Sequence, residues 1–144
     1  MKVQKKTKDF VINRLAVLQA NSLFDDQGIA KRKYNTEYYR CDNVNSDIEL
    51  YISVKSPKLF VTHGVYLNNS TKIDLTNNPV VIGTDSGLKD QRLYIYSVAS
   101  SIEDDITFTL NVTLKDGPKS KSYSASLFLD KDETGEIVLQ INFV

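Results

Sequence analysis

The sequence predicts an all-β protein: an antiparallel β-sandwich of seven to eight strands, Ig-like or jelly-roll-like, with an extended basic N-terminal arm. Residues 106–114 read ITFTLNVTL, in which apolar and polar residues alternate with the period of two expected of a strand with one buried face. Short segments of this kind recur through residues 46–144 and are separated by turn residues. No segment has convincing amphipathic-helix periodicity, which favours a sandwich over a mixed fold.

The strand pattern is regular from residue 46 onward. Residues 46–55 place Ile48, Leu50, Ile52 and Val54 on one face, and the apolar run 58–68 follows the turn at Pro57. Residues 68–87 are rich in turn residues and hold two short apolar pieces, 73–75 and 80–82. Four longer segments complete the series, at residues 91–100, 105–115, 121–130 and 136–144. Turns that contain glycine separate the last three of these segments.

The N-terminal third is less regular. Residues 1–8 hold four lysines and are predicted to form a basic arm, and residues 9–19, DFVINRLAVLQ, fit a strand with a bend at Asn13–Arg14 or a short helix. Residues 20–45 are predicted to be a long excursion with room for one edge strand. A chain of 144 residues has the size of one domain, so residues 9–144 are expected to share one core.

The net charge of zero hides an uneven distribution. Residues 1–40 hold nine Lys or Arg and four Asp or Glu, a net +5, and the remainder carries −5. Such asymmetry predicts an arm that meets an acidic partner, either nucleic acid or the acidic body of another copy; a solvated basic tail is the alternative. Basic residues are not interleaved with stacking aromatics, so sequence-specific nucleic-acid binding is not expected. The predicted partner-binding residues are Lys2, Lys5, Lys6, Lys8, Lys31, Arg32 and Lys33.

Composition argues against a disulfide scaffold, a secreted protein and a membrane protein. Cys41 is the only cysteine, so it cannot form an intrachain disulfide and is expected to be a small buried hydrophobe. Asn13 and Arg14 interrupt the N-terminal apolar stretch, which makes it a poor signal-peptide core. No apolar run approaches the roughly 20 residues of a membrane span. The chain is expected to be made and kept in a cytoplasm, or to leave it by a route other than secretion.

The only histidine, His63, is the one residue that suggests catalysis. Histidine often acts as a general acid or base, but the sequence places no serine or cysteine nucleophile beside it. A histidine followed by glycine inside a strand is more often a bulge or surface residue. We therefore expect no enzyme activity, no catalytic residue and no cofactor.

An acidic turn near the C-terminus resembles the start of a calcium loop. The segment that begins at Asp130 places oxygen-bearing side chains at loop positions one, three and five and a glycine at position six, but position twelve is Ile141 rather than glutamate. A hairpin turn explains the same residues better. A second acidic loop at 103–105 could add ligands if it lay beside the first. The weak calcium candidates are Asp130, Asp132, Thr134 and Glu136.

Tyrosine is the one unusual enrichment, with eight residues. Tyr51, Tyr66, Tyr94 and Tyr96 fall on predicted strands and are expected at or near the sheet faces. Outward tyrosines suit protein–protein contact or stacking against a sugar, although tyrosine is also simply a good strand former. A glycan- or cell-surface-binding module is therefore an alternative function.

Residues 87–144 carry a family resemblance. GLKDQRLYIYSVASSIEDDITFTLNVTLKDG, followed by YSASLFLDKDETGEIVLQINFV, resembles the β-sandwich structural proteins of tailed, crAss-like bacteriophages of Bacteroides-type hosts. The likeness lies in the succession of strands, and it transfers no functional residue. It implies a virion component made in the host cytoplasm, such as an auxiliary capsid (decoration) protein on the capsid shell. A head–tail connector or tail component is the alternative, with other virion proteins or further copies of the chain as partners.

Overall fold

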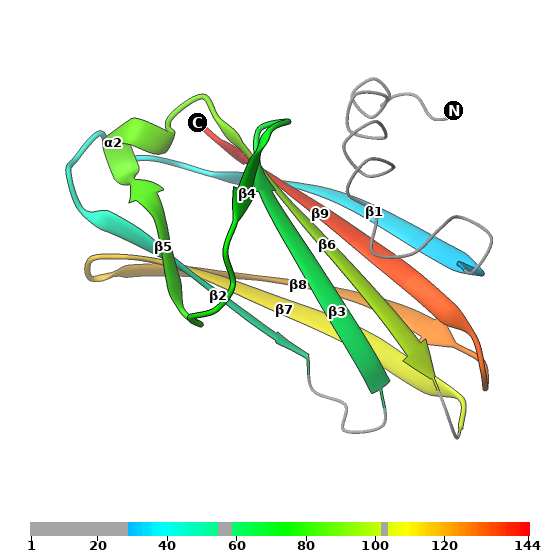
Figure 1. Cartoon of the computed structure of the whole chain (residues 1–144). Helices are drawn as coiled ribbons and strands as arrows, with labels where there is room; N and C mark the ends of the chain where they lie inside the picture. The colour runs from blue at the N-terminus through cyan, green and yellow to red at the C-terminus, as the bar shows by residue number, and fades with distance from the viewer. Residues whose placement is uncertain (1–28, 55–58, 102–103) are drawn as a thin grey trace.

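The structure is a computed structural model that describes residues 29–54, 59–101 and 104–144. These residues form a nearly all-β protein with nine strands and one short helix (Figure 1). In chain order the elements are β1 (Lys31–Tyr39), β2 (Asp47–Val54), β3 (Leu59–Leu67), β4 (Thr71–Ile73), β5 (Val80–Thr84), α2 (Asp85–Leu88), β6 (Arg92–Ser101), β7 (Ile106–Asp116), β8 (Lys119–Leu129) and β9 (Thr134–Phe143). Residues 9–19, predicted as a strand or a short helix, and the lysines of the arm lie outside the described residues.

The strands form two sheets that face each other. One sheet has five strands in the order β1-β9-β6-β3-β4, and the other has four in the order β5-β2-β7-β8. All pairs are antiparallel except β1 with β9, which is parallel and places Lys31 opposite Gly135 and Tyr39 opposite Phe143. The predicted all-β class is confirmed, and the two sheets are consistent with a sandwich-like arrangement. The predicted antiparallel pairing holds for every described pair except β1 with β9, because β1 enters the sheet beside the last strand of the chain.

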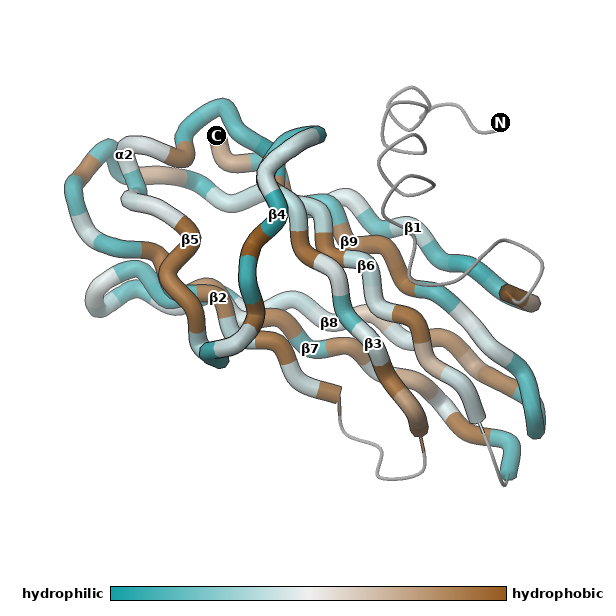
Figure 2. Tube along the Cα trace, in the orientation of Figure 1, coloured by the Kyte–Doolittle hydropathy of each residue, from teal (hydrophilic) through white to brown (hydrophobic). Residues whose placement is uncertain are grey.

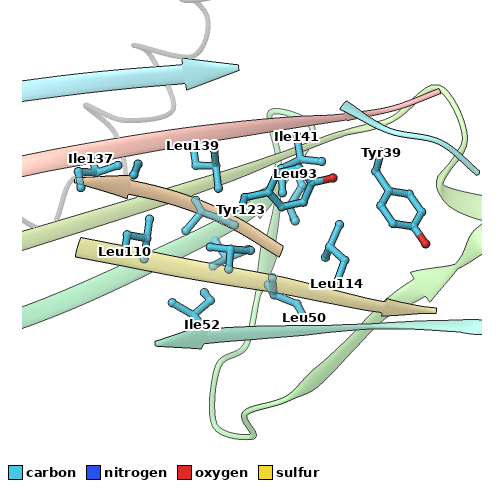
Figure 3. Packing of buried hydrophobic residues seen from close by; sticks show 14 of the residues in the cluster. Tyr39, Leu50, Ile52, Leu93, Leu110, Leu114, Tyr123, Ile137, Leu139 and Ile141 are labelled. Carbon is cyan, nitrogen blue, oxygen red and sulfur yellow. The ribbon is translucent and has the colours of Figure 1, made fainter. Parts of the chain in front are cut away.

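The apolar alternation read from the sequence builds the core between the sheets. On β7, Phe108, Leu110, Val112 and Leu114 have no exposed surface. Figure 3 shows inward side chains from both sheets meeting in this layer, among them Leu50, Leu139 and Ile141. Each such side chain contributes roughly 1.5–3 kcal/mol of transfer free energy, so packing between the sheets is the main source of stability.

Gly135 marks a tight point of the packing. A Cβ atom at this position would lie 2.6 Å from Cδ2 of Leu129 and 2.7 Å from Cδ2 of Leu127. The glycine therefore lets β9 pass close to β8 at the end of the hairpin that joins them. The structure therefore gives this glycine a packing role.

Edge strand β1 lies within the predicted excursion. The prediction allowed one edge strand within residues 20–45, and nine of those residues form it. Its sequence, KRKYNTEYY, alternates in exposure but has no apolar face until Tyr39, which is why hydrophobic periodicity detects it poorly. Figure 2 shows β1 largely hydrophilic along its length, in contrast to the strands whose apolar residues line the core.

The two lateral sides of the sandwich are closed differently. On one side, edge strand β1 lies beside edge strand β8, with side chains of each bonded to the backbone of the other. On the other side, residues 74–79 cross from β4 in the five-stranded sheet to β5 in the four-stranded sheet (Figure 1). Within the described part of the chain, no helix is long and apolar enough to cross a membrane.

Candidate functional site: the hydroxyl-rich face of the four-stranded sheet

The outward face of the four-stranded sheet is a broad surface of small polar side chains. The register of β7 with β8 pairs Thr109 with Ser126, Asn111 with Ser124 and Thr113 with Ser122. On the other side of β7, β2 places Tyr51 opposite Thr113 and Ser53 opposite Asn111. We call this surface the hydroxyl face, and its members are Tyr51, Ser53, Thr107, Thr109, Asn111, Thr113, Ser122, Ser124, Ser126 and Phe128.

The hydroxyl face carries no charged side chain among these members, and its hydroxyls are ordered by one another. Thr109 Oγ1 lies 2.9 Å from Ser126 Oγ, and Thr113 Oγ1 lies 2.9 Å from Ser122 Oγ. Cross-strand hydroxyl pairs of this kind stabilise a sheet by a few tenths to about 1 kcal/mol each. They also fix the side chains before any partner arrives, which lowers the entropy cost of binding.

Two aromatic rings project from this polar surface. Tyr51 is 45% exposed and Phe128 is 50% exposed, on strands at opposite sides of β7. Depletion of charge with exposed aromatic rings is typical of the centre of a protein–protein interface. Lys115 and Glu49, opposite each other in the next row, give the face a charged margin at one end.

The lysines on β1 lie at the seam between the two sheets. Lys31 Nζ donates to the backbone oxygen of Phe128 at 3.0 Å, and Lys33 Nζ donates to that of Ser126 at 3.0 Å. In return, Tyr123 Oη and Lys121 Nζ donate to the backbone oxygen of Tyr38 at 2.9 and 3.2 Å. These bonds satisfy carbonyl groups that two neighbouring edge strands would otherwise leave open.

The predicted partner-binding residues divide into two groups. Lys2, Lys5, Lys6 and Lys8 lie outside the described residues. Lys31 also forms an ion pair with Glu133, with Nζ 3.0 Å from Oε1. Arg32 Nε lies 3.1 Å from Glu136 Oε1. The three basic residues of β1 therefore have partners within the chain, and their predicted role in binding another molecule stays a prediction.

His63 is positioned by a serine that substrate cannot reach. On neighbouring strands β3 and β6, His63 Nδ1 lies 2.7 Å from Ser97 Oγ, and Ser97 is fully buried. Burial lowers the pKa of His63, so the ring is neutral at pH 7. A serine buried behind its histidine cannot attack a substrate in solution, so this pair has the geometry of a structural hydrogen bond.

His63 also lies on the wall of a cavity of about 540 Å³ between β3 and the segment that leaves β4. Its other polar wall groups include Lys72 and the carboxylate of Asp74, which accepts bonds from Thr76 N at 2.9 Å and Thr76 Oγ1 at 2.6 Å. The Asp74 carboxylate is therefore used to shape its own turn. Apolar Ile73 and Leu75 form part of the remaining wall.

Cys41 is half-buried and has no disulfide partner. Burial, together with the nearby carboxylates of Asp85 and Asp116, raises the pKa of its thiol to about 11. A thiol with this pKa is protonated at neutral pH and is a weak nucleophile. The prediction of a small, buried residue is supported, although part of the side chain remains accessible.

Sequence analysis did not single out the buried carboxylates near Cys41. Asp85 is fully buried and accepts bonds from the backbone N–H groups of Asp42 and Val44, both at 3.1 Å. Asp116 accepts a bond from Tyr39 Oη at 2.8 Å and another from Ser46 Oγ. The two aspartates thus fasten residues 40–46, the crossing from β1 to β2.

Burial alone would raise the pKa of Asp85, but hydrogen bonds outweigh it. The Asp116 side chain and the backbone N–H groups of residues 42–44 stabilise the ionised form and lower the pKa of Asp85 to about 2. Asp85 is therefore a charged anchor for the crossing at neutral pH.

The weak calcium candidates do not converge on one point. Glu136 is bonded to Arg32, and Thr134 Oγ1 lies 2.6 Å from Ser100 Oγ. Asp130 lies in the hairpin turn, where its Oδ2 atom is 3.6 Å from Lys31 Nζ. The two acidic loops do lie beside each other, because Asp105 Oδ1 accepts a hydrogen bond from Lys131 N at 2.9 Å. Even so, no group of metal-ligating side chains occurs among the described residues.

The tyrosines expected at the sheet faces differ in accessibility. Tyr51 is exposed on the hydroxyl face, whereas Tyr66, Tyr94 and Tyr96 are only 3–4% exposed. All three buried rings belong to the five-stranded sheet and pack against one another, with Tyr66 and Tyr96 edge to face at 5.8 Å. They are unavailable for sugar stacking in this conformation.

Comparison with known protein families, with curated proteins and with solved structures finds no match for this chain. The functional interpretation therefore depends on the fold and on the surfaces described above.

Proposed function

We propose that this chain is a non-catalytic structural protein that binds another protein through the hydroxyl face. The resemblance of residues 87–144 makes a virion the setting of this proposal, with an auxiliary capsid protein on the capsid shell as its most specific form. In this setting the protein is made in the host cytoplasm and ends in the particle. The Ig-like or jelly-roll-like assignment belongs to the same proposal, and two facing sheets of five and four strands support it.

The observation that carries the proposal is the hydroxyl face itself. The members of the hydroxyl face carry no charge, are ordered by their own hydroxyl pairs and include the exposed rings of Tyr51 and Phe128, so they can be desolvated at low cost. A face serving only solubility is expected to carry charges of both signs. The described residues carry such charges elsewhere, for example at the β8–β9 turn and beside β1.

The candidate reactive groups support a non-catalytic role. Ser97 is buried behind His63, and the raised pKa of Cys41 keeps its thiol protonated. Neither group combines access to substrate with the activation that a nucleophile needs.

Glycan binding is the second candidate function, and exposed Tyr51 is the observation in its favour. A single exposed ring among hydroxyl and amide groups could stack on one sugar unit and donate hydrogen bonds to it. The burial of Tyr66, Tyr94 and Tyr96 removes the larger aromatic platform on which that alternative first depended.

The test uses virus particles produced from a genome that lacks the coding sequence of this chain. Purified protein is added to the particles, and bound protein is measured by sedimentation at physiological salt. We expect saturable binding by the natural protein and at least a tenfold loss for Tyr51→Lys, which puts a charge in the hydroxyl face. Tyr38→Lys is the matched control, because Tyr38 is 57% exposed on the other sheet.

Equal binding by the two variants would overturn the assignment of the face. No binding by well-folded natural protein would overturn the virion role. A glycan array with the same variants addresses the second candidate, which fails if no glycan binds above background or if Tyr51→Lys binds normally.

A further inference from the structure

The cavity of about 540 Å³ beside His63 lies at the edge of the five-stranded sheet, where β4 leaves β3. The two strands pair at only three positions, and the last of them joins Val65 to Ile73. The same register would bring Leu75 opposite His63, but residues 74–79 cross to the four-stranded sheet instead (Figure 1). The space beside His63 is therefore left open, and its volume falls in the range of small-molecule sites.

His63 offers this cavity one defined hydrogen-bond donor. The buried hydroxyl of Ser97 lies 2.7 Å from His63 Nδ1 and has no other partner in the described part of the chain. A buried hydroxyl proton without an acceptor costs free energy, so we assign Ser97 as the donor and Nδ1 as the acceptor. Burial lowers the pKa of His63 and keeps the ring neutral at pH 7. The single ring proton is therefore on Nε2, the nitrogen turned away from the buried serine.

Lys72 adds a positive charge to the same wall. Its ammonium group forms no ion pair with any residue that the structure describes. Asp74 is the one acid of the wall, and hydrogen bonds from Thr76, with the nearby charge of Lys72, lower its pKa. The Asp74 carboxylate is thus ionised at pH 7 and already bonded within its own turn. Its charge disfavours a ligand that carries more than one negative group.

We propose that this cavity binds a small monocarboxylate with an aliphatic body. The carboxylate accepts a hydrogen bond from His63 Nε2 and pairs with the ammonium group of Lys72. Charge-assisted bonds of this kind are stronger than bonds to a neutral acceptor, which favours an acid over the corresponding amide.

The aliphatic body has a matching part of the wall. Ile73 and Leu75 line the cavity and are partly buried against the hydrophobic core. An aliphatic chain that contacts them is removed from water together with their exposed surface, which favours binding. The site belongs to the five-stranded sheet and is independent of the partner proposed for the hydroxyl face.

The test follows His63 by NMR in the full chain. His63 is the only histidine, so its ring signals are assigned without ambiguity. Long-range proton–nitrogen spectra at pH 7 show which ring nitrogen carries the proton. Isocaproate is then titrated into the protein, with isocaproamide as its uncharged counterpart. Both titrations are repeated with Lys72→Met and with the control Lys115→Met, which removes an exposed lysine from the outward side of β7.

We expect the ring proton on Nε2 and a saturable shift of the His63 signals with isocaproate. The amide should bind at least fivefold more weakly than the acid. Lys72→Met should weaken isocaproate binding at least fivefold, and Lys115→Met by less than twofold. Both lysines are exposed, so both variants are expected to fold, and their spectra check this.

Four results would overturn the proposal. They are a ring proton on Nδ1, no saturable shift with isocaproate, equal affinity for the acid and the amide, and equal affinity of the two lysine variants for the acid.

Discussion

Lys33 Nζ on β1 donates a hydrogen bond to the backbone oxygen of Ser126 on β8, 3.0 Å away, and so joins the edges of the two sheets. An inward-pointing lysine is a known means of blocking an edge strand against pairing with another chain. Lys31 repeats the arrangement two residues earlier, at the backbone oxygen of Phe128. The basic character of β1 therefore has a structural use beyond any contact with an acidic partner.

The first prediction concerns this seam. Lys33→Ala removes the donor to Ser126 and opens part of the β8 edge, so we expect increased self-association at high protein concentration. Sedimentation velocity at two or more concentrations measures it. Lys115→Ala, which removes an exposed lysine from the outward side of β7, is the control. The same association state for both variants would contradict a role for Lys33 in edge protection.

The second prediction concerns Asp85. Asp85→Asn keeps the shape of the side chain but removes the charge that accepts bonds from the backbone of residues 42–44. We expect a loss of about 1.5–3 kcal/mol in the free energy of unfolding, the usual range for hydrogen bonds to charged groups. Urea denaturation measures the loss. Asp47→Asn, at an exposed position, should change stability by less than about 0.5 kcal/mol.

The third prediction is the pH dependence of that stabilisation. The pKa of Asp85 is lowered to about 2 in the folded chain, from the ordinary value near 3.8. A lowered pKa stabilises the fold above the ordinary value, and the contribution is lost as the pH falls toward 2. The stability difference between the natural protein and Asp85→Asn should therefore shrink between about pH 4 and about pH 2. A constant difference over that range would show that Asp85 is not a charged anchor.

The fourth prediction concerns the single thiol. Because the pKa of Cys41 is raised to about 11, its reaction with a maleimide at pH 7.5 should be at least tenfold slower in the folded chain than in the urea-unfolded chain. The folded-state rate should keep rising up to pH 9. Equal rates in the two states would mean that the thiol is neither shielded by burial nor affected by the carboxylates beside it.

The two central strands of the four-stranded sheet were accessible to sequence analysis. On β2 and β7 the apolar residues alternate strictly, and the structure buries that face of each strand with almost no exposure. Period-two alternation records a physical requirement, the separation of a dry face from a wet one, so it can be read without a structure.

Strand β1 and the two aspartates show why other features were missed. Strand β1 is held by backbone pairing with β9 and by side-chain bonds to β8, neither of which needs an apolar face. Asp85 and Asp116 are far apart in the sequence and meet only because α2 and the end of β7 lie beside residues 40–46. Such long-range polar contacts leave no local pattern.

The hydroxyl face illustrates the difference between predicting a surface and interpreting it. Its outward Thr, Ser and Asn residues follow from the alternation on β7 and β8, but the sequence alone suggested that contacts would lie elsewhere, in the basic N-terminal region. The register brings these residues into continuous rows with Tyr51 on β2 and with Phe128 on β8, and this shared uncharged surface is visible only in the assembled sheet.

The central claim is that the hydroxyl face is the binding surface of a structural protein. A cryo-electron microscopy map of the native assembly tests it most directly. The proposal predicts that Tyr51, Asn111 and Ser124 are buried against a neighbouring virion protein, while the five-stranded sheet faces away from that contact. A map in which the hydroxyl face is open to solvent and the protein is held through another surface would contradict the claim.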